Sequence, residues 1–385
     1  MLPHRSRRDR LVERVARVCA RAQDPLELFE SVAGLVRAEV PYASAGWILI
    51  DPDTMLINAV YGEDVDHALH RDLIACELAE DDLNKFWELA REGVAAVALS
   101  ASTDGELTQS TRWSRIYGPH GYGDELRAVF ATGKVAWGHA CLTRSAEDPF
   151  YTAEEVDLVA AVAPHVANGI RSCYLLGDLT GGAPVESPAM VVLDDDGSVV
   201  SLTAQAAAWL GDPTQVDATI VLHEVAQQAR ALAVGAVSDR LPDGSAGGTA
   251  PTTPLDQPAM ARARSRDGEW LVVRGVRLTD GDGNGQPGTT ALVLEPARRA
   301  DLAPLLLGLH QLTDREREVT QLLLHGMSTG EIAQELWISP ETLRGHVKSV
   351  FAKLGVSSRP ELAALLSHEP RSRVRPAEPA GRRSR

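Results

Sequence analysis

Four helix-start signals recur between residues 312 and 366, and they constrain this chain more than any other feature of its sequence. Three are capping boxes, in which a serine or threonine is followed three residues later by a glutamate: Thr313 and Glu316, Ser328 and Glu331, and Ser358 and Glu361. In a capping box the two side chains satisfy backbone N–H groups reciprocally, which fixes where a helix begins. The fourth signal is Ser339 followed by Pro340, since proline is favoured at the first helical position. Apolar residues at helical spacing follow each signal, so the segment predicts four short helices.

Only "WIS", residues 337–339, separates the second of these helices from the third. So short a connection forces a sharp angle and is typical of a helix-turn-helix, and we expect Trp337 to pack within the turn. On the third helix Arg344 and Lys348 lie four residues apart and share a side. Such a pair on its own is usually a solvated face. In this setting it predicts entry into the major groove of double-stranded DNA, where arginine can bind a guanine edge and lysine a base or a phosphate.

This segment resembles the LuxR/NarL-type helix-turn-helix domain through "LTxREREV" at 312–319, "GxSxxEIAxxLxIS" at 326–339, "TLRxHV" at 342–347 and "KLGVxSR" at 353–359. The resemblance implies a DNA-binding domain over residues 305–369 whose third helix reads base edges. We expect its DNA contacts to come from the start and the exposed side of that helix: Ser339, Glu341, Thr342, Arg344, Gly345, His346, Lys348 and Lys353. Gly345 replaces a side chain that is usual at a base-facing position, so fewer base edges should be read there. Residues 370–385, rich in arginine, are expected to form a basic disordered tail.

The first half of the chain alternates helical and strand patterns. Strands are expected at "AGWILID", "DTMLINAVY", "DELRAVFAT" and "KVAWGHACLTRS", with a turn at "ATGK" (131–134) and a closing helix over 151–176 that is capped by Thr152 and Glu155. This order resembles a GAF domain, here assigned to residues 1–178. In that fold a ligand would lie between the sheet and the loops before its last two strands. The candidate pocket residues are Trp113, Tyr117, His120, Tyr122, Trp137 and His139, although ordinary loop packing remains the alternative for the aromatic loop.

Residues 184–298 contain strand, Asp-Gly turn, strand and short helix, followed by a second pair of strands around another Asp-Gly turn. This pattern resembles a degenerate PAS domain, a family that binds small ligands or dimerises.

In the GAF-like segment, Trp137, His139 and Cys141 alternate along one expected strand and should therefore share a face. Pro164 is expected to kink the helix over 151–176.

The composition limits the possible chemistry. The formal net charge is −15, so contact with nucleic acid must come from a local basic surface. The four cysteines form no CxxC pair, and the glycines of "GDGNGQPG" lack a following helix, so we expect no metal site, no cofactor and no enzymatic activity. No apolar run is long enough to span a membrane, and we expect a cytoplasmic location without membrane association.

These observations predict a multidomain α+β fold, with GAF-like and PAS-like α/β sensor domains followed by an all-α four-helix helix-turn-helix DNA-binding domain. We expect a sequence-specific transcriptional regulator that binds DNA as a homodimer, because one short helix reads few base pairs. An unidentified small-molecule effector and RNA polymerase are further expected partners. The alternatives are a sigma-like factor associated with RNA polymerase, and an enzyme built on the GAF fold.

Overall fold

The computed structural model describes residues 6–177, 189–211, 216–238, 258–279 and 285–367. The chain divides into two compact units, of which the first comprises Met1–Ala297 and Pro304–Gln311 and the second Arg298–Ala303 and Leu312–Arg385. Residues 304–311, next to the domain boundary expected at residue 305, belong with the first unit. The tail predicted for 370–385 lies outside the described residues.

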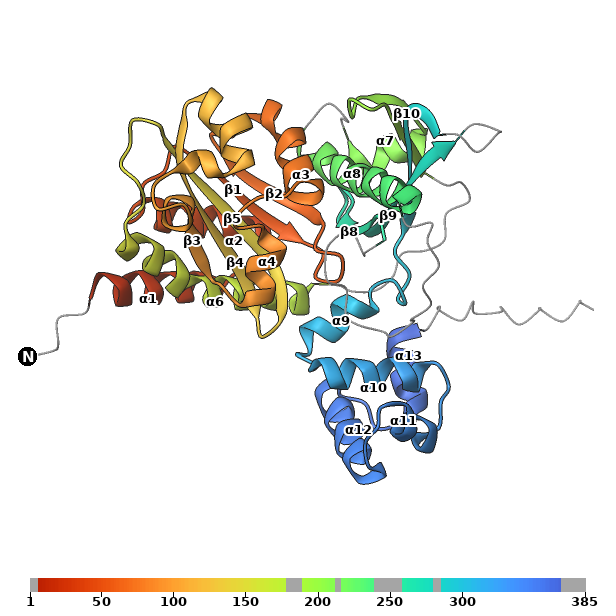
Figure 1. Cartoon of the computed structure of the whole chain (residues 1–385). Helices are drawn as coiled ribbons and strands as arrows, with labels where there is room; N and C mark the ends of the chain where they lie inside the picture. Colours follow the sequence, from red (N-terminus) through yellow and green to blue (C-terminus); the bar gives the residue numbers. More distant parts are fainter. Residues whose placement is uncertain (1–5, 178–188, 212–215, 239–257, 280–284, 368–385) are drawn as a thin grey trace, which may run out of the picture. The chain divides into compact units, whose positions relative to one another are not determined.

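The first half of the first unit is built around a five-stranded antiparallel sheet in the order β2-β1-β5-β4-β3 (Figure 1). Its strands are β1 (Ser44–Ile50), β2 (Ile57–Glu63), β3 (Ala96–Ala98), β4 (Tyr122–Thr132) and β5 (Val135–Ser145). Its helices are α1 (Arg7–Cys19), α2 (Pro25–Arg37), α3 (His70–Ala79), α4 (Phe86–Glu92), α5 (Leu99–Ser102) and α6 (Ala153–Leu176). The short helical turns are η1 (His67–Leu69), η2 (Leu107–Gln109), η3 (Trp113–Tyr117) and η4 (Gly118–His120).

Helices α2 and α6 cover one face of this sheet. Phe29 of α2 packs against Trp47 of β1 and Phe130 of β4, with ring centroids 5.9 Å apart in both pairs, and all three rings are buried. The expected capping box of Thr152 and Glu155 starts α6, which continues through Pro164 to Leu176. The predicted closing helix is thus confirmed. The predicted turn at 131–134 is also confirmed, where Gly133 takes a φ of 60° that favours glycine.

The second half of this unit has a sheet with the same relative strand order, β7-β6-β10-β9-β8, also antiparallel. Its elements are β6 (Ala189–Leu193), β7 (Val199–Leu202), α7 (Ala204–Leu210), α8 (Val216–Ser238), β8 (Met260–Arg264), β9 (Trp270–Thr279) and β10 (Gly285–Pro296). Gly197 and Gly268 occupy the two predicted Asp-Gly turns, with φ values of 77° and 83°. The long helix α8 was not predicted from the sequence.

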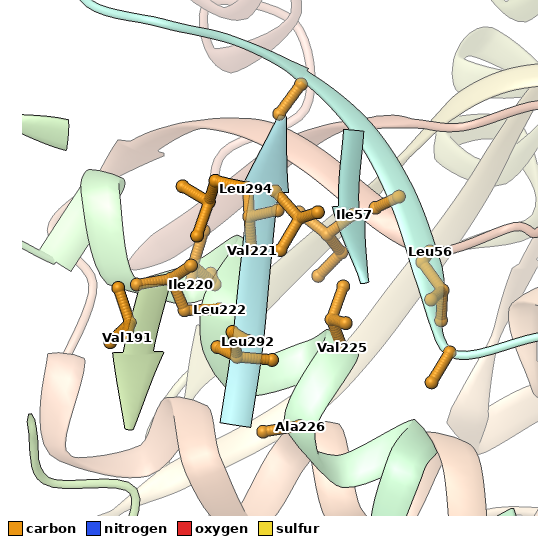
Figure 2. Packing of buried hydrophobic residues seen from close by; sticks show 14 of the residues in the cluster. Leu56, Ile57, Val191, Ile220, Val221, Leu222, Val225, Ala226, Leu292 and Leu294 are labelled. Atoms are coloured by element: carbon orange, nitrogen blue, oxygen red, sulfur yellow. The ribbon is translucent and has the colours of Figure 1, made fainter. Parts of the chain in front are cut away.

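The two halves of the first unit share one hydrophobic core. Leu56 and Ile57, at the start of β2, belong to the same buried cluster as Val221 and Val225 of α8 and Leu292 of β10 (Figure 2). Burial of apolar side chains stabilises a fold by about 25 cal/mol per Å² removed from water. Because this cluster is continuous, the segments expected as separate GAF-like and PAS-like domains are packed as one body.

The second unit is all-helical, and the end of α9 (Ala303–Leu309) connects to it. Its helices are α10 (Asp314–Leu324), α11 (Thr329–Glu335), α12 (Pro340–Leu354) and α13 (Arg359–Ser367). The capping boxes of α10 and α11 form as predicted, and Ser339 caps α12 by accepting from the N–H of Thr342. The four expected helices are therefore confirmed. The fold as a whole is multidomain α+β, ending in an all-helical unit.

The expectation for Trp337 is wrong. This residue is 94% exposed and has a φ of 53°, a left-handed conformation that is uncommon for a bulky side chain. Its backbone makes the turn, since its N–H donates to the carbonyl of Gln334, while its side chain is left exposed to solvent. Among the helices in the described ranges, none has both the length and the apolar character needed to cross a membrane.

Candidate DNA-binding surface and ligand cavity

Helix α12 is positioned by a buried stripe and by its two ends. Leu343, Val350 and Leu354 face the core of the helical unit, while Pro340 begins the helix and Gly355 ends it with a φ of 66°. The hydroxyl groups of Ser339 and Thr342 lie 2.9 Å apart at the exposed start. Hydroxyls and free N–H groups at a helix start are suited to binding a phosphate.

The side of α12 that faces away from this core carries the predicted reading residues. Arg344, Gly345 and Lys348 are exposed, and His346 is half-buried. The guanidinium of Arg344 contacts only its own helix, donating from Nε to the carbonyl of Pro340 at 3.3 Å. Within the described part of the chain Lys348 has no hydrogen-bonding or ion-pair partner. A Cβ added at Gly345 would meet no atom within 4 Å, so the surface at this position is open.

Lys353 differs from the other expected DNA contacts because its charge is matched inside the domain. Its ammonium donates to the carboxylate of Glu316 at 2.6 Å, and Ser349 donates to the same carboxylate at 2.6 Å. Burial alone would raise the pKa of Glu316, but hydrogen bonds from Lys353, Ser349 and Thr313 lower it to about 2. Glu316 is therefore more than a capping residue, since it ties α10 to α12.

Two further arginines of this unit have structural partners. Arg315 donates to the carbonyl of Leu336, at the end of α11, and Arg359 donates to the carbonyls of Leu323 and Met327. Cations near the last carbonyls of a helix satisfy acceptors that have no partner within the helix. Of the basic residues on α12, Arg344 and Lys348 remain for contact with an outside molecule.

The first unit contains a cavity of about 130 Å³ between its first sheet, α3, α4 and α8. Most of its wall is apolar, from residues such as Ile48, Leu73, Ile74 and Phe86. Of the six candidate pocket residues, three line this cavity: Tyr117, Tyr122 and His139. Ile220 and Glu224 of α8 close it from the second half of the unit.

The other three candidates lie elsewhere. The indole of Trp113 donates to the carbonyl of Gly123 at 2.8 Å, and His120 is exposed with Nδ1 2.6 Å from the carbonyl of Ile116. Neither residue lines the cavity. Trp113 and His120 thus bind carbonyl groups of their own segment of the chain.

Trp137 is separated from His139 by a β-bulge. Phe130 pairs with Gly138, whereas Ala131 pairs with Ala136, so Trp137 has no partner across the ladder. A bulge inserts one residue and re-aims the side chains that follow. The indole of Trp137 therefore packs near Tyr174 of α6, with ring centroids 6.1 Å apart, while His139 and Cys141 line the cavity. The expectation that all three share a face is wrong for Trp137.

A buried ionic network supports one side of the cavity. Arg127 donates to Glu125 at 2.9 Å and to Glu77 at 2.7 Å, and Arg112 donates to Glu125 and to Asp82 at 2.7 Å each. Burial alone would raise the pKa of Glu125, but the two arginines lower it to about 2. Sequence reasoning missed this network, because its members are far apart along the chain. The sequence signal that could have revealed it is the presence of charged residues, Glu125 and Arg127 among them, within the mostly apolar strand β4.

Two polar side chains in the cavity wall have few or no hydrogen-bond partners within the protein. His139 stacks on Phe86 with ring centroids 3.7 Å apart, and its Nδ1 is buried without a hydrogen-bond partner. Burial, together with the charge of Arg127, lowers the pKa of His139 to about 3, which keeps the imidazole neutral. Glu224 accepts from the N–H of Ile57, and burial raises its pKa to about 8.

Cys141 also lines the cavity, and its thiol donates to Glu125 at 2.9 Å. Burial, with the neighbouring Glu125, raises the pKa of this thiol, so it stays protonated. All four cysteines are free thiols. In the described ranges no three His, Cys, Asp or Glu side chains are grouped so that they could hold a metal ion.

The geometry of α10–α13 defines a helix-turn-helix domain, and comparison with known proteins places it in a family. Residues 310–366 match the family model of bacterial regulatory proteins of the luxR family. This part of the chain is a LuxR-family helix-turn-helix domain.

Two curated relatives align with the same region. Over 48 residues the chain is 52% identical to the spore germination protein GerE of Bacillus subtilis, covering 12% of this chain and 65% of that protein. Over 52 residues it is 50% identical to the transcriptional regulatory protein UhpA of Escherichia coli, covering 14% of this chain and 26% of UhpA. The match thus spans less than two thirds of either relative.

Solved structures containing GAF domains are among the structural neighbours of the chain. The GAF domain/HD domain protein from Geobacter sulfurreducens covers 42% of this chain and 99% of its own, with 13% identity and a TM-score of 0.32. At this level the likeness carries no argument about function.

Proposed function

We propose that the chain is a DNA-binding transcriptional regulator whose first unit senses a small molecule and controls the helix-turn-helix unit. The observation that carries the proposal is the exposed side of α12, where Arg344 and Lys348 stand unpaired with other side chains within a LuxR-family domain. Arg344 would read a base edge, and Lys348 would contact a base or a phosphate.

The start of α12 would fix the register of the domain on DNA. Ser339 and Thr342 place two hydroxyls there, beside Glu341, and the two hydroxyls are suited to a phosphate oxygen. Because Gly345 has no side chain, the backbone of α12 could approach the groove closely at this position, and His346 would lie at the side of the contact. Lys353 would contribute less than Lys348, because Glu316 already neutralises it.

The control step would use the cavity of the first unit. A ligand there would contact the sheet of the first half and α8 of the second half at once. Such a ligand changes the activity of the protein only if it binds two arrangements with different affinity. A homodimer is proposed because paired recognition helices double the base contacts of one short helix.

A regulator is favoured over an enzyme built on the GAF fold. The protonated, buried thiol of Cys141 is a poor nucleophile, since the thiolate is the reactive form. The family model that matches residues 310–366 is also one of regulatory proteins.

Selection of a randomised duplex pool by the full-length protein, over a series of salt concentrations, tests the DNA-binding proposal. We expect enrichment of a two-fold symmetric site, with Arg344→Ala losing about 1–3 kcal/mol at one base position. Lys348→Ala should weaken binding and reduce the salt slope by about 1. Arg21→Ala, an exposed arginine of the first unit, is the matched control and should bind as wild type. Selection of no sequence, or indifference to Arg344→Ala, would rule out base reading by α12.

A further inference from the structure

The size of the cavity limits what it can take. Its volume of about 130 Å³ is close to the roughly 150 Å³ of an apolar cavity that binds benzene. Pockets for drug-sized ligands are larger, about 300–1,000 Å³. The cavity of the first unit therefore suits a molecule with a single ring.

The charges of the wall disfavour an ionic ligand. Arg127 is already matched by Glu125 and Glu77, and Asp66 is exposed to water. The third carboxyl group of the wall, Glu224, stays protonated at neutral pH, because burial raises its pKa to about 8. A charged ligand would lose its hydration without meeting an unmatched charge of opposite sign on the buried part of this wall. Neutral molecules do not incur this cost.

The wall nevertheless offers hydrogen bonds. The side chain of His139 lines the cavity, and its Nδ1 is buried without a partner; an unsatisfied buried polar atom costs about 1–3 kcal/mol. The carboxyl of Glu224, on α8, has the N–H of Ile57 as its hydrogen-bond partner and is also part of the wall. A ligand with a polar group could form the hydrogen bonds that the protein itself does not provide to these side chains.

From these observations we infer that the cavity binds a neutral, single-ring molecule bearing a hydroxyl or carbonyl group, and that His139 hydrogen-bonds to that group. Glu224 lines the same cavity from α8, so the ligand touches both halves of the first unit. This inference rests on the proposed sensory role of the cavity and names the chemical class of its ligand.

Phenol is the probe, titrated into the full-length protein by calorimetry, with benzoate and benzylammonium as single-ring ligands of opposite charge. We expect phenol to bind and the two ions to bind at least tenfold more weakly. His139→Phe keeps the ring that stacks on Phe86 but removes Nδ1, and it should weaken phenol binding about 2- to 10-fold. Gly46→Val should abolish binding, because Gly46 lines the cavity and a Cβ there meets only the side chain of Ile48, at 3.6 Å.

Thermal unfolding without phenol shows that each variant is folded. The inference is overturned if phenol does not bind the wild type, if benzoate binds equally well, or if folded Gly46→Val retains phenol affinity. Site-specific DNA binding that depends on Arg344, measured on the same preparation, separates these outcomes from a failure of the proposed regulator. A protein that selects a DNA site but ignores phenol refutes the ligand class alone.

Discussion

The guanidinium of Arg262 in β8 donates to both carboxylate oxygens of Asp51, which follows β1, at 2.8 and 2.7 Å. Asp51 also accepts from the backbone N–H of Arg262, and both side chains are almost completely buried. This pair joins the two sheets of the first unit at a distance of more than two hundred residues along the chain. Together with the shared hydrophobic cluster, it makes the two halves one body.

Asp51→Ala should destabilise the first unit strongly. Removing one partner of a buried ion pair typically costs about 3–5 kcal/mol, and here Arg262 would retain the half-exposed carboxylate of Asp53, at 3.2 Å. Urea unfolding followed by tryptophan fluorescence measures the change. Glu295→Ala breaks the exposed pair with Arg274 in the second sheet and, as the control, should cost less than about 1 kcal/mol. Equal losses in the two variants would contradict a special role for Asp51.

Glu224 should make the stability of the first unit depend on pH. Its pKa is about 8 in the folded protein, above the ordinary 4.5, because burial penalises the charged form. Between these values the folded state holds a proton that the unfolded state has lost, so this contribution falls as pH rises, by up to about 1.4 kcal/mol per pH unit. The difference in unfolding free energy between Glu224→Gln and wild type should therefore grow from pH 4.5 to 8. His139 has an opposing effect on the pH dependence of stability, which is the same in both proteins and cancels in this difference. A difference that stays constant with pH would refute the raised pKa of Glu224.

Lys353→Met should affect stability more than DNA binding. The variant removes the ammonium that is hydrogen-bonded to buried Glu316, and charge-assisted hydrogen bonds contribute about 1.5–3 kcal/mol. Because the folded pKa of Glu316 is lowered to about 2, its contribution is present above about 4.5 and is lost as pH falls toward 2. Chemical unfolding at pH 7 and pH 3 should show the loss at pH 7 and a smaller loss at pH 3. The salt slope of DNA binding should stay unchanged, in contrast to Lys348→Ala, and a slope reduced by both variants would assign Lys353 to DNA.

Gly345→Ala should stabilise the helical unit. Glycine in a helix interior costs about 0.5–1 kcal/mol relative to alanine, and a methyl group here meets no neighbour within 4 Å. The midpoint of thermal unfolding should rise. Gly355→Ala is the opposite control, since the φ of 66° at that position strains any other residue. A loss of stability in Gly345→Ala would show that α12 needs glycine for packing.

The sequence was sufficient for the helical unit because its signals are local. A capping box such as Thr313 with Glu316 acts within one helical turn, and the short connection at 337–339 restricts how α11 and α12 can meet. The hairpin at Gly133 and the start of α6 at Thr152 followed from the same short-range rules. The exposure of Trp337 could not be predicted in this way, because short-range sequence signals do not indicate which side of a turn faces the core.

Tertiary structure decided what depends on residues far apart in the chain. The bulge at Trp137 broke an alternation that the sequence presents as regular, and only pairing with β4 reveals it. The role of helix α8 emerges only from its packing on β2 and β9. The contacts of Glu224 with Ile57 and of Arg262 with Asp51 likewise exist because folding brings together elements separated by more than 150 residues. Local hydrogen bonds and residue spacing thus determined the helix-turn-helix unit. Long-range packing determined the cavity and joined the two halves of the first unit.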